Sequence, residues 1–191
     1  MMKIAVIGGI GSGKSYVLNL IAGFGERVCD CDAIYKEISV TDDYVKSIAK
    51  VFDVVKDGVI DRKKLAETVF SDREKLKLLN SVAHPLVFEK LDKIYAEDKG
   101  NLYVEVSAFD KAMSDKFDKI ILVDGDKEVR INRVIDRSGY DREYIENVMR
   151  EQASLEEMKN SADYIIVNDS DKENLREKVK AVLDDINKTD K

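Results

Sequence analysis

The sequence is poor in cysteine, histidine and proline, has no tryptophan and lacks a long apolar run. Its two cysteines, Cys29 and Cys31, stand two residues apart, and a single histidine cannot complete a zinc site with them. We therefore expect two buried or half-buried thiols, both on one face of a strand, in a cytoplasmic protein. No apolar stretch approaches the length that crosses a bilayer, so we expect no membrane partner.

Acidic residues outnumber basic ones by 38 to 32, which gives a formal net charge of −6. This balance argues against a general surface for polyanions, and we expect no nucleic-acid partner. It leaves room for a local phosphate site, because such a site works through backbone dipoles and a few cations. The first residues already have the pattern of a strand, so we expect no cleavable targeting segment.

What the chain does contain is a glycine-rich loop at residues 8–15, Gly-Gly-Ile-Gly-Ser-Gly-Lys-Ser. An apolar run precedes it and a helical pattern follows, which is the strand–loop–helix context of a phosphate-binding loop. Its backbone N–H groups and the dipole of the next helix favour a phosphate. Lys14 is predicted to reach the terminal phosphates of a nucleoside triphosphate, and the Ser15 hydroxyl to bind Mg²⁺. We expect nucleotide contacts from Gly9, Ile10, Gly11, Ser12, Gly13, Lys14, Ser15 and Tyr16.

Short apolar runs of β-forming residues alternate with helical patterns along the chain. The expected strands are 3–7, 27–31, 101–106, 119–124 and 163–168. Helices are expected at 42–52, 62–80 and 83–98, from Asp126, and after the capping-box pairs Ser154–Glu157 and Ser170–Glu173. Buried strands that alternate with helices predict an α/β fold, a doubly wound parallel five-stranded sheet of the P-loop NTPase type.

We expect a single P-loop kinase domain over residues 1–191, with its core at about 1–35 and 100–191. The interval between the second and third strands is longer than one crossover helix needs. It predicts a helical, substrate-binding insertion at about 40–99, in which Pro85 begins a helix. A helical lid is expected at about 133–160.

Two carboxylates, Asp30 and Asp32, end the second predicted strand. Ligands of doubly wound sheets bind at the carboxyl ends of the strands, where an ionised Asp can accept a hydroxyl proton or hold Mg²⁺ through water. Helix capping is the alternative, and position alone does not decide between the two.

Arg130, Arg133 and Arg137 have the spacing of one stripe on a helix. Beside a phosphate site such a stripe predicts a lid that neutralises charge on the transferred group, and a solvated charged face is the alternative. The lone histidine, His84, is more typical of a structural cap or core group than of a catalyst. Residues 187–190 match the guanine-specificity signature of GTPases, but they end a helix where that signature follows a strand, so we reject it.

In order along the chain, these motifs resemble the dephospho-coenzyme A kinase family. The loop at 8–15 has that family's wording, residues 28–32 resemble its D-x-D segment, and 61–70 resemble the stretch leading to its His-Pro motif, here His84-Pro85. Arg133, residues 137–139 and Gln152 fall in the register of its lid. Residues 155–157, 162–164 and 167–168 match the segment that leads to its last strand.

The resemblance implies phosphoryl transfer from ATP, with Mg²⁺, to the ribose 3′-hydroxyl of the small-molecule substrate dephospho-CoA. It implies that Asp32 is the base and that Lys14, Arg133 and Arg137 stabilise the transferred group. It also implies that Asp32, His84 and Pro85 contact the substrate, and that Asn168 contacts the nucleotide.

The chain departs from the family pattern at several positions. The family's V-P-L-L-F-E stretch is faint in residues 106–110, and Ala66, Val148, Met158 and Ser161 stand where the family usually carries basic residues. Arg150 and Lys159 are candidates to replace one such contact. These losses keep two alternatives open: another small-molecule kinase with a nucleoside- or nucleotide-type acceptor, and a nucleotide-binding module without kinase activity.

Overall fold

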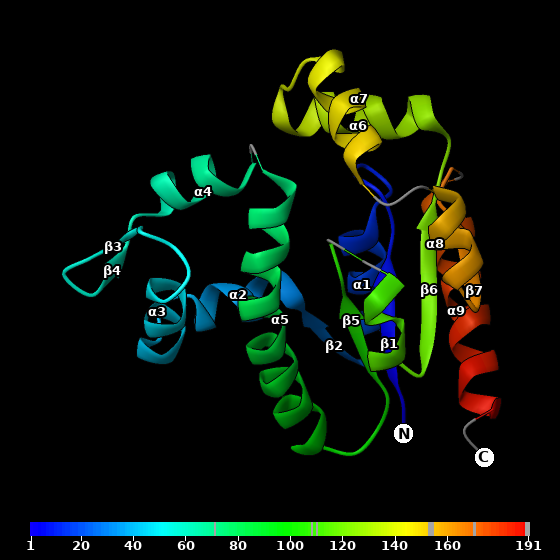
Figure 1. Cartoon of the computed structure of the whole chain (residues 1–191). Helices are drawn as coiled ribbons and strands as arrows, with labels where there is room; N and C mark the ends of the chain where they lie inside the picture. Colours follow the sequence, from blue (N-terminus) through cyan, green and yellow to red (C-terminus); the bar gives the residue numbers. More distant parts are fainter. Residues whose placement is uncertain (71, 108, 110, 153–154, 170, 190–191) are drawn as a thin grey trace. The chain divides into compact units, whose positions relative to one another are not determined.

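The computed structural model describes residues 1–70, 72–107, 109, 111–152, 155–169 and 171–189. It divides into two compact units (Figure 1). Unit 1 comprises Met1–Asp30 and Lys99–Lys191, and unit 2 comprises Cys31–Asp98. In the part of the chain that the structure describes, no helix is long and apolar enough to cross a bilayer.

Unit 1 is built on a five-stranded sheet in the order β2-β5-β1-β6-β7, and every neighbouring pair in it is parallel. The strands are β1 (Lys3–Ile7), β2 (Arg27–Asp30), β5 (Leu102–Glu105), β6 (Lys119–Asp124) and β7 (Tyr164–Val167). All five lie within the ranges that the sequence predicts. The α/β fold with a parallel five-stranded sheet is confirmed.

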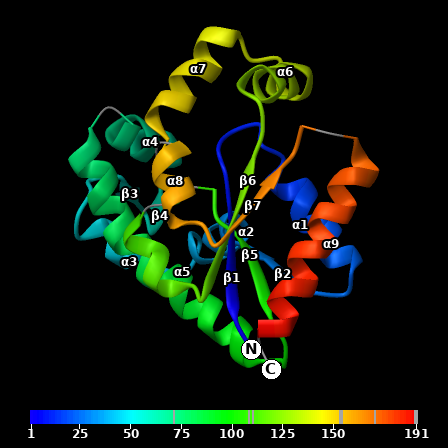
Figure 2. The ribbon, with the colours of Figure 1, turned by 90° about the vertical axis from the view of Figure 1, so that its right-hand side faces the viewer.

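Helices cover both faces of this sheet, which is why the middle residues of its central strands β1, β5 and β6 are apolar and buried. The helices of unit 1 are α1 (Lys14–Gly23), the 3₁₀ helix η1 (Lys111–Lys116), α6 (Lys127–Ser138), α7 (Arg142–Glu151), α8 (Leu155–Ser161) and α9 (Lys172–Thr189). In Figure 2, α1 and α9 lie side by side on one face of the sheet, and α8 lies on the other. Residues 4–7 of the central strand β1 are fully buried.

The core under α1 and α9 joins residues that are distant in sequence. Ile4 and Val6 of β1 belong to one cluster with Val17 of α1 and Val179 of α9. Burial of each such side chain stabilises the fold by about 1.5–3 kcal/mol. This packing fixes α1, and with it the loop that precedes α1, against the carboxyl end of β1.

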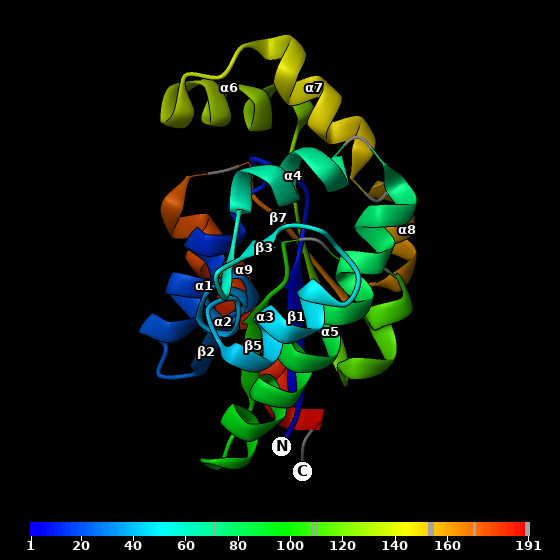
Figure 3. The ribbon, with the colours of Figure 1, turned by 60° about the vertical axis from the view of Figure 1, so that its left-hand side comes forward.

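Unit 2 is a helical unit with one short hairpin (Figure 3). Its elements are α2 (Cys31–Ile38), α3 (Asp42–Ala49), β3 (Val55–Lys56), β4 (Val59–Ile60), α4 (Arg62–Phe70) and α5 (Arg73–Ala96). The long helix α5 contacts α2, α3 and α4. Tyr44 and Ile48 of α3 form the buried centre, together with Leu65 of α4 and Ala83 of α5.

The expected helix break before Pro85 is wrong. Pro85 lies inside α5, and the break comes earlier, at Asp72, whose side chain accepts from the N–H groups of Glu74 and Lys75. A proline inside a helix costs about 3 kcal/mol. Burial of Ala83, Val87 and Leu91 on the same helix offsets that cost, so tertiary packing overrides the local signal.

The two cysteines are half-buried, as expected, but they do not share a strand face, because β2 ends at Asp30 and Cys31 begins α2. Asp126 caps α6 as predicted, accepting from the N–H groups of Glu128 and Val129. Asp171 caps α9 by accepting from the N–H groups of Glu173 and Asn174. The expected cap residues Ser154 and Ser170 lie outside the described residues, as do Ala108, Asp110 and Asp190.

Candidate active site

The carboxyl ends of the parallel strands of unit 1 bring polar residues together beside the glycine-rich loop. Glu105, which ends β5, is the register partner of Val6 in β1 and of Asp30 in β2. Asp124 ends β6 opposite Val167, the last residue of β7. Glu105 and Asp124 are both buried. This is the edge at which doubly wound sheets bind their ligands.

The loop at 8–15 connects β1 directly to α1. Gly13, at the N-cap of α1, has φ +90°, a left-handed conformation that strongly favours glycine. Inside the loop the Ser12 N–H donates to the Gly9 carbonyl across 3.2 Å. Nζ of Lys14 donates to the Gly8 carbonyl across 2.8 Å, so the ammonium is held at the loop's first residue. The loop therefore has the curled backbone and the lysine of a phosphate-binding loop.

Ser15 is held by a buried carboxylate. Its Oγ donates to Oε1 of Glu105 across 2.9 Å, and Glu105 is only 8% exposed. A hydroxyl and a carboxylate are the oxygen ligands that Mg²⁺ prefers. This pair therefore fits a magnesium ion that takes its remaining ligands from water and nucleotide phosphates.

Asn168 and Arg133 support the loop from the side of β7. Nδ2 of Asn168 donates to the Ser12 carbonyl across 2.7 Å. Arg133 in turn donates from Nη1 to the Asn168 carbonyl across 2.9 Å and from Nη2 to its Oδ1 across 3.4 Å. Asn168 is 5% exposed. Arg133 of α6 is thus connected to the middle of the loop through Asn168.

Arg130 and Gln152 bond the two backbone polar groups of Ile10. Nε of Arg130 donates to the Ile10 carbonyl across 3.0 Å, and Oε1 of Gln152 accepts from the Ile10 N–H across 2.8 Å. Arg130 is buried at 8% exposure. Burial lowers the pKa of its guanidinium, while the charge of Asp124 acts in the opposite direction. An arginine nevertheless stays protonated in proteins.

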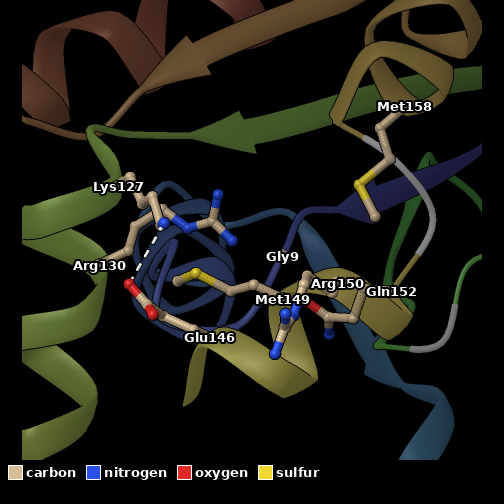
Figure 4. A pocket seen from close by; sticks show the side chains of 8 residues that line it. All are labelled: Gly9, Lys127, Arg130, Glu146, Met149, Arg150, Gln152 and Met158. Atoms are coloured by element: carbon tan, nitrogen blue, oxygen red, sulfur yellow. Dashed lines mark ion pairs between the residues drawn. The ribbon is translucent and has the colours of Figure 1, made fainter. Parts of the chain in front are cut away.

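A pocket of about 380 Å³ opens between the start of the loop and helices α6, α7 and α8 (Figure 4). Its lining residues are Gly9, Lys127, Arg130, Glu146, Met149, Arg150, Gln152 and Met158. Lys127 and Glu146 form an ion pair at 3.3 Å, drawn as a dashed line in Figure 4. The other two cations of the wall, Arg130 and Arg150, leave the pocket with a net positive lining.

The structure brings Lys14, Ser15, Arg133, Gln152 and Asn168 together in unit 1, around one loop. Asp30 lies at the end of β2 in the same unit. Arg137 is exposed, and its Nε donates to Oγ of Ser138 across 3.3 Å. Tyr16 is 39% exposed on α1.

The residues expected at the substrate belong to unit 2. Asp32 is exposed in the first turn of α2, two residues beyond the last residue of β2. His84 is half-buried on α5 with its ring edge-on to Phe88, at 6.4 Å between ring centroids, and Pro85 beside it is exposed.

Sequence reasoning missed Glu105 and undervalued Arg130. Glu105 carried a usable signal, because it lies near the end of the predicted strand 101–106, as Asp30 does in the strand 27–31. Arg130 was visible only as one member of a stripe, since its contacts with residues 9–10 join segments 120 residues apart. The GTPase-like match at 187–190 is rejected on contacts as well. Asn187 bonds with Asn101 and Glu26, as a structural residue does.

The residues that stand where the family usually carries basic side chains differ in burial and contacts. Met158 is buried and faces the pocket, and Val148 is half-buried on α7. Oγ of Ser161 donates to the Glu157 carbonyl. Of the two candidate replacements, Lys159 pairs with Asp124 at 3.1 Å, and Arg150 bonds with Asn147 at the pocket rim.

Comparison with known proteins identifies the relatives of this chain. A family model described as dephospho-CoA kinase matches residues 2–174. A protein of Fusobacterium nucleatum subsp. nucleatum named dephospho-CoA kinase is 39% identical, over 97% of this chain and 99% of that protein. The solved structure of TT1252 from Thermus thermophilus superposes with a TM-score of 0.82 at 32% identity, over 96% of this chain and 97% of that one.

A more distant neighbour shows the breadth of the fold. Shikimate kinase from Acinetobacter baumannii, solved with shikimate, is 13% identical and superposes with a TM-score of 0.56, over 99% of this chain and 94% of that one. That likeness is one of fold alone. The relatives that match over nearly the full length of this chain are named dephospho-CoA kinase, so they do not favour the alternative of a kinase with another acceptor. The chain belongs to the dephospho-CoA kinase family, whose members are ATP-dependent kinases of dephospho-CoA.

Proposed function

We propose that this chain transfers the γ-phosphoryl group of ATP to the ribose 3′-hydroxyl of dephospho-CoA, beside the loop at residues 8–15. The observation that carries the proposal is the bond between Ser15 and buried Glu105 at the start of α1, directly after Lys14. A metal-binding hydroxyl, a phosphate-binding lysine and the N-terminus of a helix converge there. Family membership supplies the acceptor.

The nucleotide binds through the loop backbone. The N–H groups at the start of α1 and the helix dipole favour the α- and β-phosphates. The Lys14 ammonium, bonded to the Gly8 carbonyl in this structure, is proposed to exchange that carbonyl for the terminal phosphates when the nucleotide binds. Arg133 and Arg137 add positive charge from α6 to the transferred group.

Mg²⁺ fits the pair of Ser15 and Glu105, which supplies a hydroxyl and a carboxylate oxygen at the foot of the loop. When bound, the ion neutralises phosphate charge. Ser15 would be its ligand, and Glu105 would orient Ser15.

Asp32 is proposed as the group that orients the acceptor hydroxyl and takes its proton as the new P–O bond forms. The proton moves from the 3′-oxygen to a carboxylate oxygen of Asp32, while the bond between the γ-phosphorus and ADP breaks. His84 and Pro85 of α5 are proposed to contact the remainder of dephospho-CoA. Positioning and charge neutralisation then provide most of the rate enhancement.

An acceptor screen tests this assignment. The purified chain is incubated with MgATP and, separately, dephospho-CoA, adenosine, AMP and shikimate, and ADP release is followed. The proposal predicts a kcat/KM for dephospho-CoA at least about 10³-fold above that for any other acceptor, because several substrate contacts of about 1–2 kcal/mol each combine. A higher kcat/KM for one of the others would overturn the assignment of the acceptor.

A further inference from the structure

The guanidinium of Arg130 is the most unusual charge in this site. It is the only lysine or arginine that is buried among the residues whose burial the structure describes. Its Nε is bonded to the Ile10 carbonyl, but within the described part of the chain neither Nη atom has a hydrogen bond or an ion pair. Burial of a charge without a counter-ion is costly, and such charges are normally paired.

The carboxylate whose charge acts on Arg130 is already engaged with other groups. Asp124 acts on Arg130 through its charge, but its Oδ1 accepts from the Gly125 N–H across 2.8 Å and its Oδ2 pairs with Lys159 at 3.1 Å. Glu146, the carboxylate among the residues that line the pocket, pairs with Lys127 and, at 3.3 Å, with Arg142. The positive charge of Arg130 is thus directed into the pocket and not into a protein ion pair.

Arg130 also packs directly on the loop. A Cβ atom at residue 9 would overlap Nη2 of Arg130, and a Cβ atom at residue 11 would overlap the Arg130 backbone carbonyl. Glycine at both positions therefore lets α6 approach the loop closely. Nζ of Lys14 lies at the Gly8 carbonyl, one residue away from the contact with Gly9. Lys14 and Arg130 thus contact the consecutive residues Gly8 and Gly9 at the start of the loop.

We infer that Arg130 is a further catalytic residue of this kinase, whose Nη atoms bind the terminal phosphate of the triphosphate in the pocket over Gly9 while Nε fixes the Ile10 carbonyl. The inference rests on the proposed function, in which Lys14 reaches that phosphate. Bound there, the guanidinium finds the counter-ion that the described residues do not provide. It donates from two Nη atoms to the phosphoryl oxygens on which negative charge develops during transfer.

Arg130→Gln tests the role, because glutamine keeps an amide donor for Ile10 and removes the charge. Arg176→Gln, at an exposed arginine of α9 that stacks on Phe24, is the matched control. Binding of ADP and of the non-hydrolysable analogue AMPPNP, each with Mg²⁺, is measured by calorimetry without acceptor. We expect Arg130→Gln to weaken AMPPNP binding by about 10–100-fold, to change ADP binding by less than about threefold and to lower kcat by about 10²–10³-fold. The control should match the wild type.

Two outcomes would overturn the inference. An equal loss of affinity for both nucleotides would make Arg130 a clamp on Ile10 alone, and unchanged affinity for AMPPNP would remove it from the phosphate. If Arg130→Gln does not fold, Arg130→Lys is measured in the same way, because lysine cannot bond Ile10 and the phosphate together. The inference again predicts a larger loss of affinity for AMPPNP than for ADP, and an equal loss for both would overturn it. Because no acceptor is present, the ratio is independent of whether dephospho-CoA is the substrate.

Discussion

Nδ2 of Asn168 donates to the backbone carbonyl of Ser12 across 2.7 Å, a contact between residues 156 positions apart. Arg133 holds both the carbonyl and the side-chain oxygen of Asn168. Asn168 also lies so close to Gly13 that a Cβ atom there would overlap its Nδ2. The end of β7 thus fixes the middle of the phosphate loop, and the loop's shape depends on a residue far outside the motif.

Asn168→Asp is expected to weaken ATP and ADP binding alike, by about tenfold each, because the donor to Ser12 becomes an acceptor that faces a carbonyl oxygen. Calorimetry with both nucleotides measures the effect. Asn160→Asp on α8, which is exposed, controls for the added charge. A loss confined to ATP would contradict the positioning role and indicate contact with the terminal phosphate.

Lys14→Ala is expected to lower kcat by about 10²–10⁴-fold and to reduce the preference for triphosphate over diphosphate. The reason is that the charge of Lys14 acts at the terminal phosphates, whereas the loop backbone binds the α- and β-phosphates of both nucleotides. Turnover and the ratio of ATP to ADP affinity are the measurements, and Lys172→Ala at the start of α9 is the control. An unchanged affinity ratio would count against this role.

Asp32→Asn is expected to keep nucleotide affinity within about twofold and to lower kcat by about 10²–10⁴-fold, because the amide cannot take the hydroxyl proton. Steady-state kinetics with dephospho-CoA and calorimetry with ATP measure the two effects separately. Asp43→Asn, at an exposed position of α3, is the control. Full activity of Asp32→Asn would remove Asp32 from the role of base.

Glu105→Gln is expected to raise the Mg²⁺ concentration needed for half-maximal activity by about 10–100-fold. The carboxylate accepts from Ser15, and its loss leaves that hydroxyl poorly oriented for the metal. The measurement is a Mg²⁺ titration at fixed ATP, with Glu173→Gln on α9 as control and with EDTA abolishing turnover in every variant. An unchanged titration curve would show that Glu105 does not tune the metal site.

The ion pair between α6 and α7 makes stability depend on pH. The hydrogen bond from Arg142 holds the pKa of Glu128 below its usual range. Because the folded-state pKa is lowered, the pair stabilises the fold above the ordinary glutamate pKa, and this contribution is lost as the pH falls through the lowered value.

Thermal unfolding of the wild type and of Glu128→Gln, compared from pH 7 to pH 3, measures that contribution. The wild type is expected to have the slightly higher Tm at neutral pH, and the difference is expected to shrink as the pH falls through the lowered pKa of Glu128. The effect is small because the pair is exposed. A Tm difference that stayed constant as the pH fell would mean that something other than the charge of Glu128 causes it.

The sequence sufficed to predict the sheet and its position beside the phosphate loop. Residues 4–7 are apolar because the strand is buried on both faces, and this pattern is visible without a structure. The loop is equally visible, since its glycines, Lys14 and Ser15 are contiguous. Local signals of this kind, where neighbouring residues serve one element, can be predicted from sequence.

What could not be predicted depends on contacts between distant segments. Pro85 predicts a helix start locally, but packing of α5 against α2, α3 and α4 carries the helix through it. Likewise, nothing near Arg130 in the sequence distinguishes it from Arg137, although one is buried at the loop and the other is exposed. Burial and pairing of charges are decided by the register of α6 on the loop, which no local pattern encodes.

The most direct test of the account is formation of CoA from MgATP and dephospho-CoA by the purified chain, followed by mass spectrometry with the site of phosphorylation assigned. The account predicts a product one phosphate heavier, phosphorylated on the ribose 3′-oxygen, in an amount that falls at least about 10²-fold with Lys14→Ala. Tight binding of MgATP without this product, or the same yield from Lys14→Ala, would contradict it.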